Sequence, residues 1–226
     1  DDRIRLSKDG VATTSDFYST YGGAYQLIRK ANGPFNVYGP RLISMHLDLN
    51  SYTNPDTLLL FYADDSEGNM QIKYVQSRPD SEPVNFDLLN SPANDAYPSF
   101  SRMGDKIYFC SDRDGNFDIY ELSIPRSESE RVTVASLVKP VKSTLRKVEE
   151  LSSPYNDKCP YLLEDLMVFV SDRPGGQGGE DIYYSEFKDG KWSAPVNAGS
   201  RINTAYNEYR PILPSLPNFN YELMIF

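Results

Sequence analysis

The chain has 226 residues, 39% of them apolar and 13% aromatic, which is enough for a buried core and excludes a wholly disordered chain. Its formal charge of −9 and its lack of clustered Lys and Arg argue against nucleic acid and against an anionic membrane surface as partners. The longest apolar run, Leu58 to Ala63, is far shorter than the roughly 18 residues of a transmembrane span, so we expect no membrane-spanning segment.

The 17 tyrosines and 11 phenylalanines favour β-strands, and 16 prolines with 14 glycines indicate frequent turns. In chain order, the sequence predicts a strand around residues 25–30, a hairpin turn at Asn32-Gly33 and a buried strand at 58–63. Residues 140–151 have helical character, and either a short helix or a long outer hairpin fits them. Further strands are expected at residues 97–101, 106–110, 166–170 and 181–187, with a hairpin turn at Asp189-Gly190.

Two segments of the chain repeat one pattern, beginning at Ser91 and at Ser153. Each contains Ser-Pro-x-Asn-Asp, then Ser-Asp-Arg, a glycine turn and Asp-Ile-Tyr. A weaker copy covers residues 58–75, another begins at Asn203, and a degenerate copy lies near the N-terminus. Four-stranded antiparallel units repeated in this way are typical of a β-propeller, because one such sheet buries its faces only against its neighbours.

We therefore predict a single all-β domain over residues 1–226, a β-propeller of four-stranded antiparallel blades with four to five blades visible. In one arrangement the C-terminal strands dock beside the N-terminal stretch SDFYSTYGGAYQLI and close a four-bladed ring. In the other, which the mid-strand end of the last copy favours, the chain is a fragment of a five- or six-bladed ring. The predicted blades cover residues 1–40, 41–90, 91–152, 153–202 and, incompletely, 203–226.

The repeats SDRDGNFDIY, SDRPGGQGGEDIYY and NEYRPIL resemble those of TolB-like, WD-repeat-like β-propellers of bacterial cell envelopes. The longer stretch DGKWSAPVNAGSRINTAYNEYRP is similar to propellers of Bacteroidetes envelope proteins. The resemblance implies an exported protein, periplasmic or outer-membrane-associated, that a lipid anchor could hold as a lipoprotein. It also implies a monomer that binds an envelope protein or a peptidoglycan-associated partner. The first and last copies depart from the full repeat.

The glycine-rich loop RPGGQGGED has three candidate roles. A phosphate site needs a following helix, and here a strand and two acidic residues follow. Calcium would use the alternating oxygens of the sister loop, although that pattern lacks the glycine and glutamate of a helix-loop-helix calcium site. A structural turn is the third role, with Arg113 paired to Asp118 and Arg173 paired to Asp181. The calcium candidates are Asp112, Asp114, Asn116 and Asp118, and the structural motif residues are Asp112, Arg113, Asp118, Asp172, Arg173 and Asp181.

Catalytic candidates are few, so we expect no enzyme. The single histidine, His46, lies near Asp48, but no Gly-x-Ser-x-Gly nucleophile motif accompanies it. A propeller glycosidase would need paired carboxylates about 5–10 Å apart in the channel. The acidic residues available for such a pair are Glu164, Asp165, Glu208 and Glu222. Cys110 and Cys159 are interpreted as apolar core residues, with a single disulfide left open.

Tyrosines near the predicted inner strands are the main candidates for binding, because tyrosine combines apolar area with a hydroxyl group. The expected function is a non-catalytic envelope scaffold that binds another protein through its rim and central channel. The alternative is a carbohydrate-active propeller that binds or hydrolyses glycans. The candidate rim and channel residues are Tyr97, Tyr155, Tyr161, Tyr206 and Tyr209.

Overall fold

The computed structural model describes residues 27–44, 58–78, 80–126, 133–213 and 224–226, which contain three antiparallel sheets. The first sheet is β1 (Val37–Ser44), β2 (Leu58–Asp64), β3 (Gln71–Gln76) and β4 (Val84–Asn85). The second is β5 (Asp95–Phe100), β6 (Lys106–Ser111), β7 (Asp118–Ser123) and β8 (Thr144–Lys147). The third is β9 (Asp157–Leu163), β10 (Leu166–Ser171), β11 (Asp181–Lys188), β12 (Lys191–Trp192) and β13 (Val196–Asn197).

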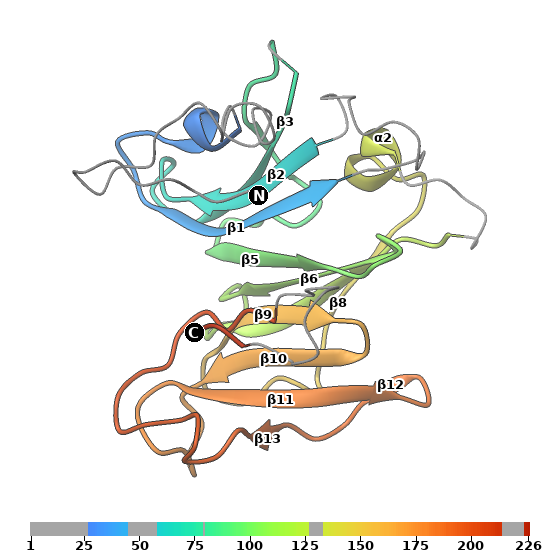
Figure 1. Cartoon of the computed structure of the whole chain (residues 1–226). Helices are drawn as coiled ribbons and strands as arrows, with labels where there is room; N and C mark the ends of the chain where they lie inside the picture. The colour runs from blue at the N-terminus through green and yellow to red at the C-terminus, as the bar shows by residue number, and fades with distance from the viewer. Residues whose placement is uncertain (1–26, 45–57, 79, 127–132, 214–223) are drawn as a thin grey trace, which may run out of the picture.

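Each sheet is a meander of consecutive strands, except that β13 pairs with β11 and not with β12. In the third sheet two short strands, β12 and β13, share the outer position beside β11. The second sheet lies between the other two (Figure 1). The prediction of an all-β propeller fold made of four-stranded antiparallel blades is therefore confirmed. How the ring closes remains a prediction, because residues 1–26 lie outside the described part of the chain.

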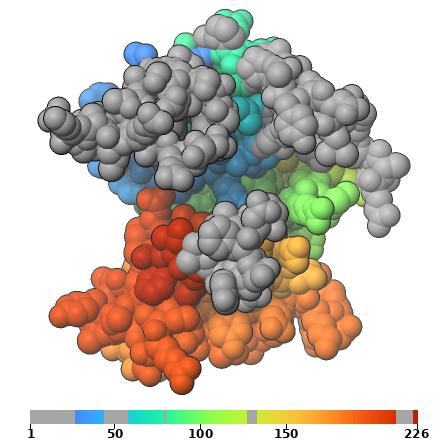
Figure 2. Space-filling model, viewed as in Figure 1, coloured from blue at the N-terminus to red at the C-terminus, as the bar shows by residue number. Residues whose placement is uncertain are grey.

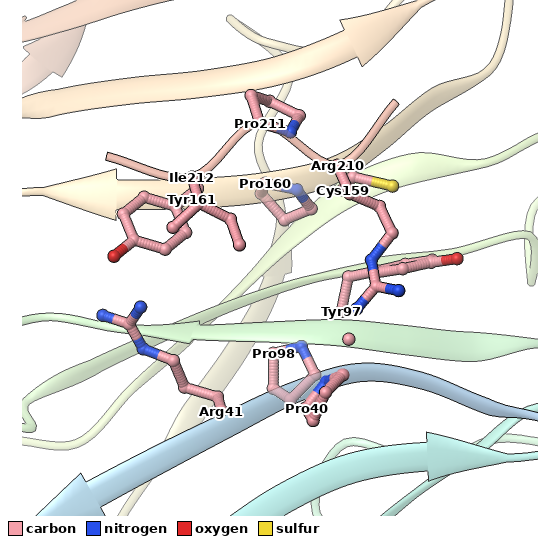
Figure 3. Close-up of a pocket in the computed structure, with 11 residues that line it drawn as sticks. Pro40, Arg41, Tyr97, Pro98, Cys159, Pro160, Tyr161, Arg210, Pro211 and Ile212 are labelled. Carbon is pink, nitrogen blue, oxygen red and sulfur yellow. The ribbon is translucent and has the colours of Figure 1, made fainter. Parts of the chain in front are cut away.

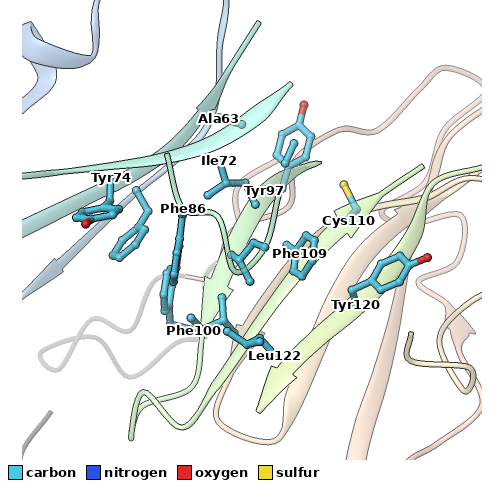
Figure 4. Close-up of a cluster of buried hydrophobic side chains, with 14 of the residues drawn as sticks. Ala63, Ile72, Tyr74, Phe86, Tyr97, Phe100, Phe109, Cys110, Tyr120 and Leu122 are labelled. Atoms are coloured by element: carbon cyan, nitrogen blue, oxygen red, sulfur yellow. The ribbon is translucent and has the colours of Figure 1, made fainter. Parts of the chain in front are cut away.

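The core lies between the sheets, because each blade has two apolar faces. Along β6, Ile107 and Phe109 belong to the apolar cluster shared with the first sheet, while Tyr108 belongs to the cluster shared with the third. The Phe61 and Phe100 rings meet across the first junction with centroids 4.6 Å apart, and Figure 4 shows this cluster. Alternation along a strand thus packs the middle blade on both sides.

The strand predicted around residues 25–30 is wrong where the structure describes it, since residues 27–31 form a helical turn. Leu27 and Ala31 are four residues apart and therefore lie on the same side of this turn. Both are buried in a cluster with side chains of the first sheet, and this packing favours the helical conformation. The other buried members of the cluster are Leu60, Tyr62 and Val75.

Residues 140–151 contain the outer strand β8, and the helix α2 (Val134–Val138) lies just before this stretch. The hairpin turn at Asp189-Gly190 is confirmed, since β11 and β12 pair on either side of it. Asn32-Gly33, by contrast, joins the helical turn to β1 and closes no hairpin. No helix within the described ranges has the length and apolarity needed to cross a bilayer.

Candidate functional site

A proline recurs where the first strand of each repeat bends. The four prolines follow Gly39, Tyr97, Cys159 and Arg210, whose φ angles are +55°, +59°, +56° and +55°. Positive φ costs residues other than glycine about 1–2 kcal/mol, so three of these positions are strained. The ladders of β1 and β5 shift register at this point, as β-bulges do. The repeated bulge therefore presents the same backbone position of every repeat to one place.

These four positions surround a pocket with a volume of about 70 Å³. Figure 3 shows the side chains converging on it from β1, β5, β9 and the C-terminal segment. Sites for small molecules usually have volumes of about 300–1,000 Å³. The pocket therefore admits one side chain rather than a sugar ring or a cofactor.

Two arginines give the pocket its charge. The Arg41 guanidinium carbon lies 4.5 Å from the centroid of the Tyr161 ring, and that of Arg210 lies 5.7 Å from the Tyr97 ring. Among the described residues, neither arginine forms an ion pair with a carboxylate and no carboxylate lines the pocket. Guanidinium groups held over aromatic faces keep their hydrogen-bond donors free for an anion.

The five candidate tyrosines fall into two groups. Tyr97 and Tyr161 line the pocket, and the Tyr209 hydroxyl shares a short hydrogen bond with the Tyr97 hydroxyl. Burial raises the pKa of Tyr209 to about 12, so this pair remains neutral at ordinary pH. Tyr155 and Tyr206 are 43% and 80% exposed in the loops that precede the first strands, away from the pocket. The structure thus brings three of the five together.

The sequence interpretation missed Arg41, Arg210 and the prolines of the pocket. A signal for three of the repeats exists in the pattern Asn-Asp/Glu-x-x-Pro, which places one proline per repeat at the same point. The pattern occurs at residues 94–98, 156–160 and 207–211. The charge of the pocket cannot be inferred in this way, because the arginines occupy different positions of the pattern in different repeats.

The predicted partners of the two motif arginines are wrong. Arg113 pairs with Asp95 at 2.6 Å, and Arg173 likewise pairs with Asp157. Asp118 instead pairs with Lys147 at 2.6 Å, while Asp181 accepts hydrogen bonds from backbone amides of the glycine-rich loop. Asp95 and Asp157 have no exposed surface, so each of these buried carboxylates needs the compensation that the arginine supplies.

The aspartate of each Ser-Asp-Arg fixes the loop before the first strand. Asp112 accepts two hydrogen bonds from Asn94, one from its backbone N–H and one from its side-chain amide, both at 2.7 Å. Asp172 accepts the equivalent pair from Asn156 at 2.7 and 2.8 Å. The Ser-Asp-Arg motif therefore joins the end of the second strand to the loop that starts the first strand of the same blade.

The calcium candidates have separate partners. Asp114 accepts a hydrogen bond from the Tyr120 hydroxyl at 2.6 Å, and Asn116 donates to the carbonyl oxygens of Ser153 and Tyr155. No group of three or more His, Cys, Asp or Glu side chains that could hold a metal occurs in the described part of the chain. The arrangement of this loop is that of a hydrogen-bonded turn.

The other catalytic candidates are dispersed. Glu164 and Asp165 are exposed in the turn between β9 and β10, and Glu208 is buried in the loop before the C-terminal segment. His46 and Glu222 lie outside the described residues.

Both cysteines are buried and free, so the structure contains no disulfide between them. Burial raises the pKa of the Cys159 thiol to about 12 and that of Cys110 well above its ordinary value. A thiol in that state is a poor nucleophile at neutral pH.

Repeated antiparallel blades with an aromatic and cationic pocket at their first strands define a β-propeller repeat protein. No family model matches the sequence, and a search of curated proteins gives no match. Two solved structures resemble the chain. One, assigned as TolB from Agrobacterium tumefaciens, is 16% identical with a TM-score of 0.46, covering 78% of this chain and 54% of that one. TolB from Acinetobacter baumannii is 17% identical with a TM-score of 0.35, covering 90% and 51%. The chain thus spans about half the length of each.

Proposed function

We propose that this chain is a non-catalytic binding module of the cell envelope. In this proposal the pocket between the first strands takes a carboxylate side chain from a partner protein. The observation that carries the proposal is the pair of arginines, Arg41 and Arg210, which face the pocket over tyrosine rings and have no carboxylate partner among the described residues. A carboxylate supplies the acceptors that two such groups need, and charge-assisted hydrogen bonds of this kind are the strong ones.

Size and chemistry both favour binding over catalysis at this pocket. A volume of about 70 Å³ suits one side chain of a partner. Among the described residues that line it, the strongest potential nucleophile is the Cys159 thiol, and its raised pKa keeps it protonated. The carbohydrate-active alternative would need paired carboxylates, and none lines the pocket in the part of the chain that the structure describes. The envelope location rests on the resemblance of the repeats.

The test uses a single residue as probe, because the partner is unidentified. N-acetyl-glutamate amide would be titrated into the labelled protein while the arginine Nε–H signals are followed by NMR. We expect saturable shifts of the Arg41 and Arg210 signals with millimolar affinity, and binding of the glutamine analogue at least tenfold weaker. Each tenfold corresponds to about 1.4 kcal/mol, a modest value for a charge-assisted pair.

Arg41→Ala and Arg210→Ala should each abolish the shifts, while Arg201→Ala, an exposed arginine outside the pocket, should leave them unchanged. Equal binding of the glutamate and glutamine probes would rule out recognition of a carboxylate. Binding that survives both pocket substitutions would rule out the pocket as the site.

A further inference from the structure

The chain contains two cysteines, and they lie in neighbouring blades. Cys110 is in β6 of the second sheet, and Cys159 is in β9 of the third. Their exposed fractions are 0% and 4%, and both belong to the same apolar cluster. The strands β6 and β9 are in contact at this junction. A bond between the two sulfur atoms would therefore join two blades inside the core.

The side chain of Cys110 faces the third sheet. Cys110 follows Tyr108 by two residues on β6, so both side chains lie on the face of the strand where Tyr108 packs against the third sheet. The Cys159 backbone N–H donates a hydrogen bond to the Cys110 sulfur. A disulfide joins Cα atoms about 4.4–6.8 Å apart. A sulfur that reaches the backbone of the other cysteine is compatible with this separation.

Neither position of the pair is reserved for cysteine in the repeat. The second-strand residue that pairs with an isoleucine of the third strand is Ala63, Cys110 or Val170 in the three sheets. The bulge position before the proline is glycine, tyrosine, cysteine or arginine. The fold thus accepts other residues at both positions, yet both cysteines occur at the junction of the second and third sheets. This coincidence favours two residues that act as a pair.

The bulge at Cys159 is a strained position, because its φ angle is +56°. Conformations of this kind persist only where the surrounding structure holds them in place. A covalent bond to β6 would hold β9 at this point.

The surroundings of the pair make the thiols unreactive once the chain has folded. The Tyr97 and Tyr209 hydroxyls share a hydrogen bond, and the Tyr209 hydroxyl also hydrogen-bonds to the Cys159 sulfur. Figure 2 shows the described C-terminal residues, in red, at the surface beside the orange third blade. Burial raises the pKa of both thiols, so little thiolate is available for exchange. A bond between them therefore has to form before the blades close, and the same burial then protects it from reduction.

We infer that Cys110 and Cys159 form a structural disulfide when this chain folds in an oxidising compartment. The structure shows the pair in its reduced form. The oxidant is itself a disulfide, either of an oxidoreductase or of a small thiol such as glutathione. Formation in the cell rests on the envelope location of the proposed function, whereas the position of the pair does not.

The bond forms by two thiol–disulfide exchanges. The thiolate of one cysteine attacks a sulfur of the oxidant, whose S–S bond breaks and releases one thiolate. The second cysteine, as a thiolate, then attacks the protein sulfur of the mixed disulfide and displaces the other half of the oxidant. Two protons pass from the protein thiols to the two released thiolates. The protein thus loses two hydrogen atoms, and the oxidant is reduced to two thiols.

The test compares how readily the bond forms in the folded and in the unfolded chain. The full chain would be refolded from urea in a series of buffers of reduced and oxidised glutathione, and a second sample would stay in urea with the same buffers. Mass spectrometry after acid quenching gives the fraction of monomer that has lost two hydrogen atoms. The quantity compared is the ratio [GSH]²/[GSSG] at which half of the chains are cross-linked. We expect this ratio to be at least tenfold higher for the folded chain, and by linkage the bond stabilises the fold by the same factor.

Cys110→Ser and Cys159→Ser are the matched controls, because each leaves one thiol and cannot form the bond within the chain. The urea midpoint of the parent should be higher after oxidative refolding than after refolding in dithiothreitol, and neither control should show this rise. An equal or lower ratio for the folded chain would overturn the inference. A folded product that is chiefly glutathionylated, or chiefly a disulfide-linked dimer, would overturn it as well. Neither outcome bears on the carboxylate pocket, because no ligand is present in this experiment.

Discussion

At the scale of single residues, buried carboxylates with complete sets of donors hold the loops of this protein. Asp95 and Asp157 have no exposed surface, and each accepts hydrogen bonds from a serine and from a motif arginine. Burial raises the pKa of Asp157, and the hydrogen bonds from Ser171 and Arg173 act in the opposite direction. The motif recurs because each blade needs the same compensation for the same buried charge.

Glu121 is a further buried carboxylate, and its effect on stability depends on pH. It is 3% exposed and accepts hydrogen bonds from the Tyr108 hydroxyl at 2.6 Å and the Ser123 hydroxyl at 2.7 Å. Burial raises its pKa, but these bonds and the charges of Lys106 and Arg146 outweigh burial and lower the pKa below 4.5. Its stabilising contribution is therefore complete above pH 4.5 and is lost as the pH falls through the folded-state pKa.

We predict that Glu121→Gln lowers the free energy of unfolding by about 1–3 kcal/mol at neutral pH, because donors and cations lose a charged acceptor. The same substitution should reduce the loss of stability on acidification below pH 4.5. Urea unfolding of both proteins at neutral and acidic pH measures this, with the exposed Glu164→Gln as control. Parallel pH profiles for the parent and Glu121→Gln would contradict the assignment.

At the scale of elements, the glycine-rich loop between β10 and β11 is a contact surface as well as a turn. A Cβ atom built on Gly178 would collide with the backbone carbonyl oxygen of Tyr206, in the loop that begins the next repeat. Gly190, in the β11–β12 turn, has φ +80° but open space around it. The two glycines are therefore required for different reasons, close approach in one and backbone conformation in the other.

Gly178→Ala should destabilise the protein by about 1–3 kcal/mol, because backbone must move to admit the methyl group. Gly190→Ala should cost about 1–2 kcal/mol through backbone strain alone. Hydrogen exchange distinguishes these two causes of destabilisation. The Glu208 N–H donates a hydrogen bond to the Glu180 carbonyl oxygen at 2.8 Å, close to the contact between Gly178 and Tyr206. We expect faster exchange at Glu208 in Gly178→Ala only, and equal protection in both variants would refute the contact role.

Elements that depend on nearby residues were predicted well from the sequence, and contacts between elements were not. The apolar runs of β6 and β10 and the turn at Asp189-Gly190 follow from local composition and were correct. The helical turn at 27–31 depends on burial against another sheet, which local sequence does not show. For the same reason the arginine partners were wrong, and Arg41 and Arg210 were missed although the two tyrosines that line the pocket were named.

At the scale of the whole molecule, the blades share their cores and should therefore unfold together. One apolar cluster contains residues of all three sheets, among them Phe61, Phe109 and Ile182. A second cluster joins the other face of the middle sheet to the third, where the Tyr108 and Trp192 rings meet with centroids 5.8 Å apart. Loss of packing at the first junction should therefore be transmitted to the third sheet through β6.

Phe61→Ala tests this coupling, because Phe61 is fully buried in the first sheet while Trp192, the only tryptophan, reports on the third. The substitution leaves a cavity beside Phe100 and should cost about 3–5 kcal/mol. We expect the urea midpoint followed by Trp192 fluorescence to fall as far as the midpoint followed by circular dichroism, with a smaller shift for Phe61→Leu. A Trp192 transition that stays in place while the circular dichroism transition moves would show that the blades unfold independently.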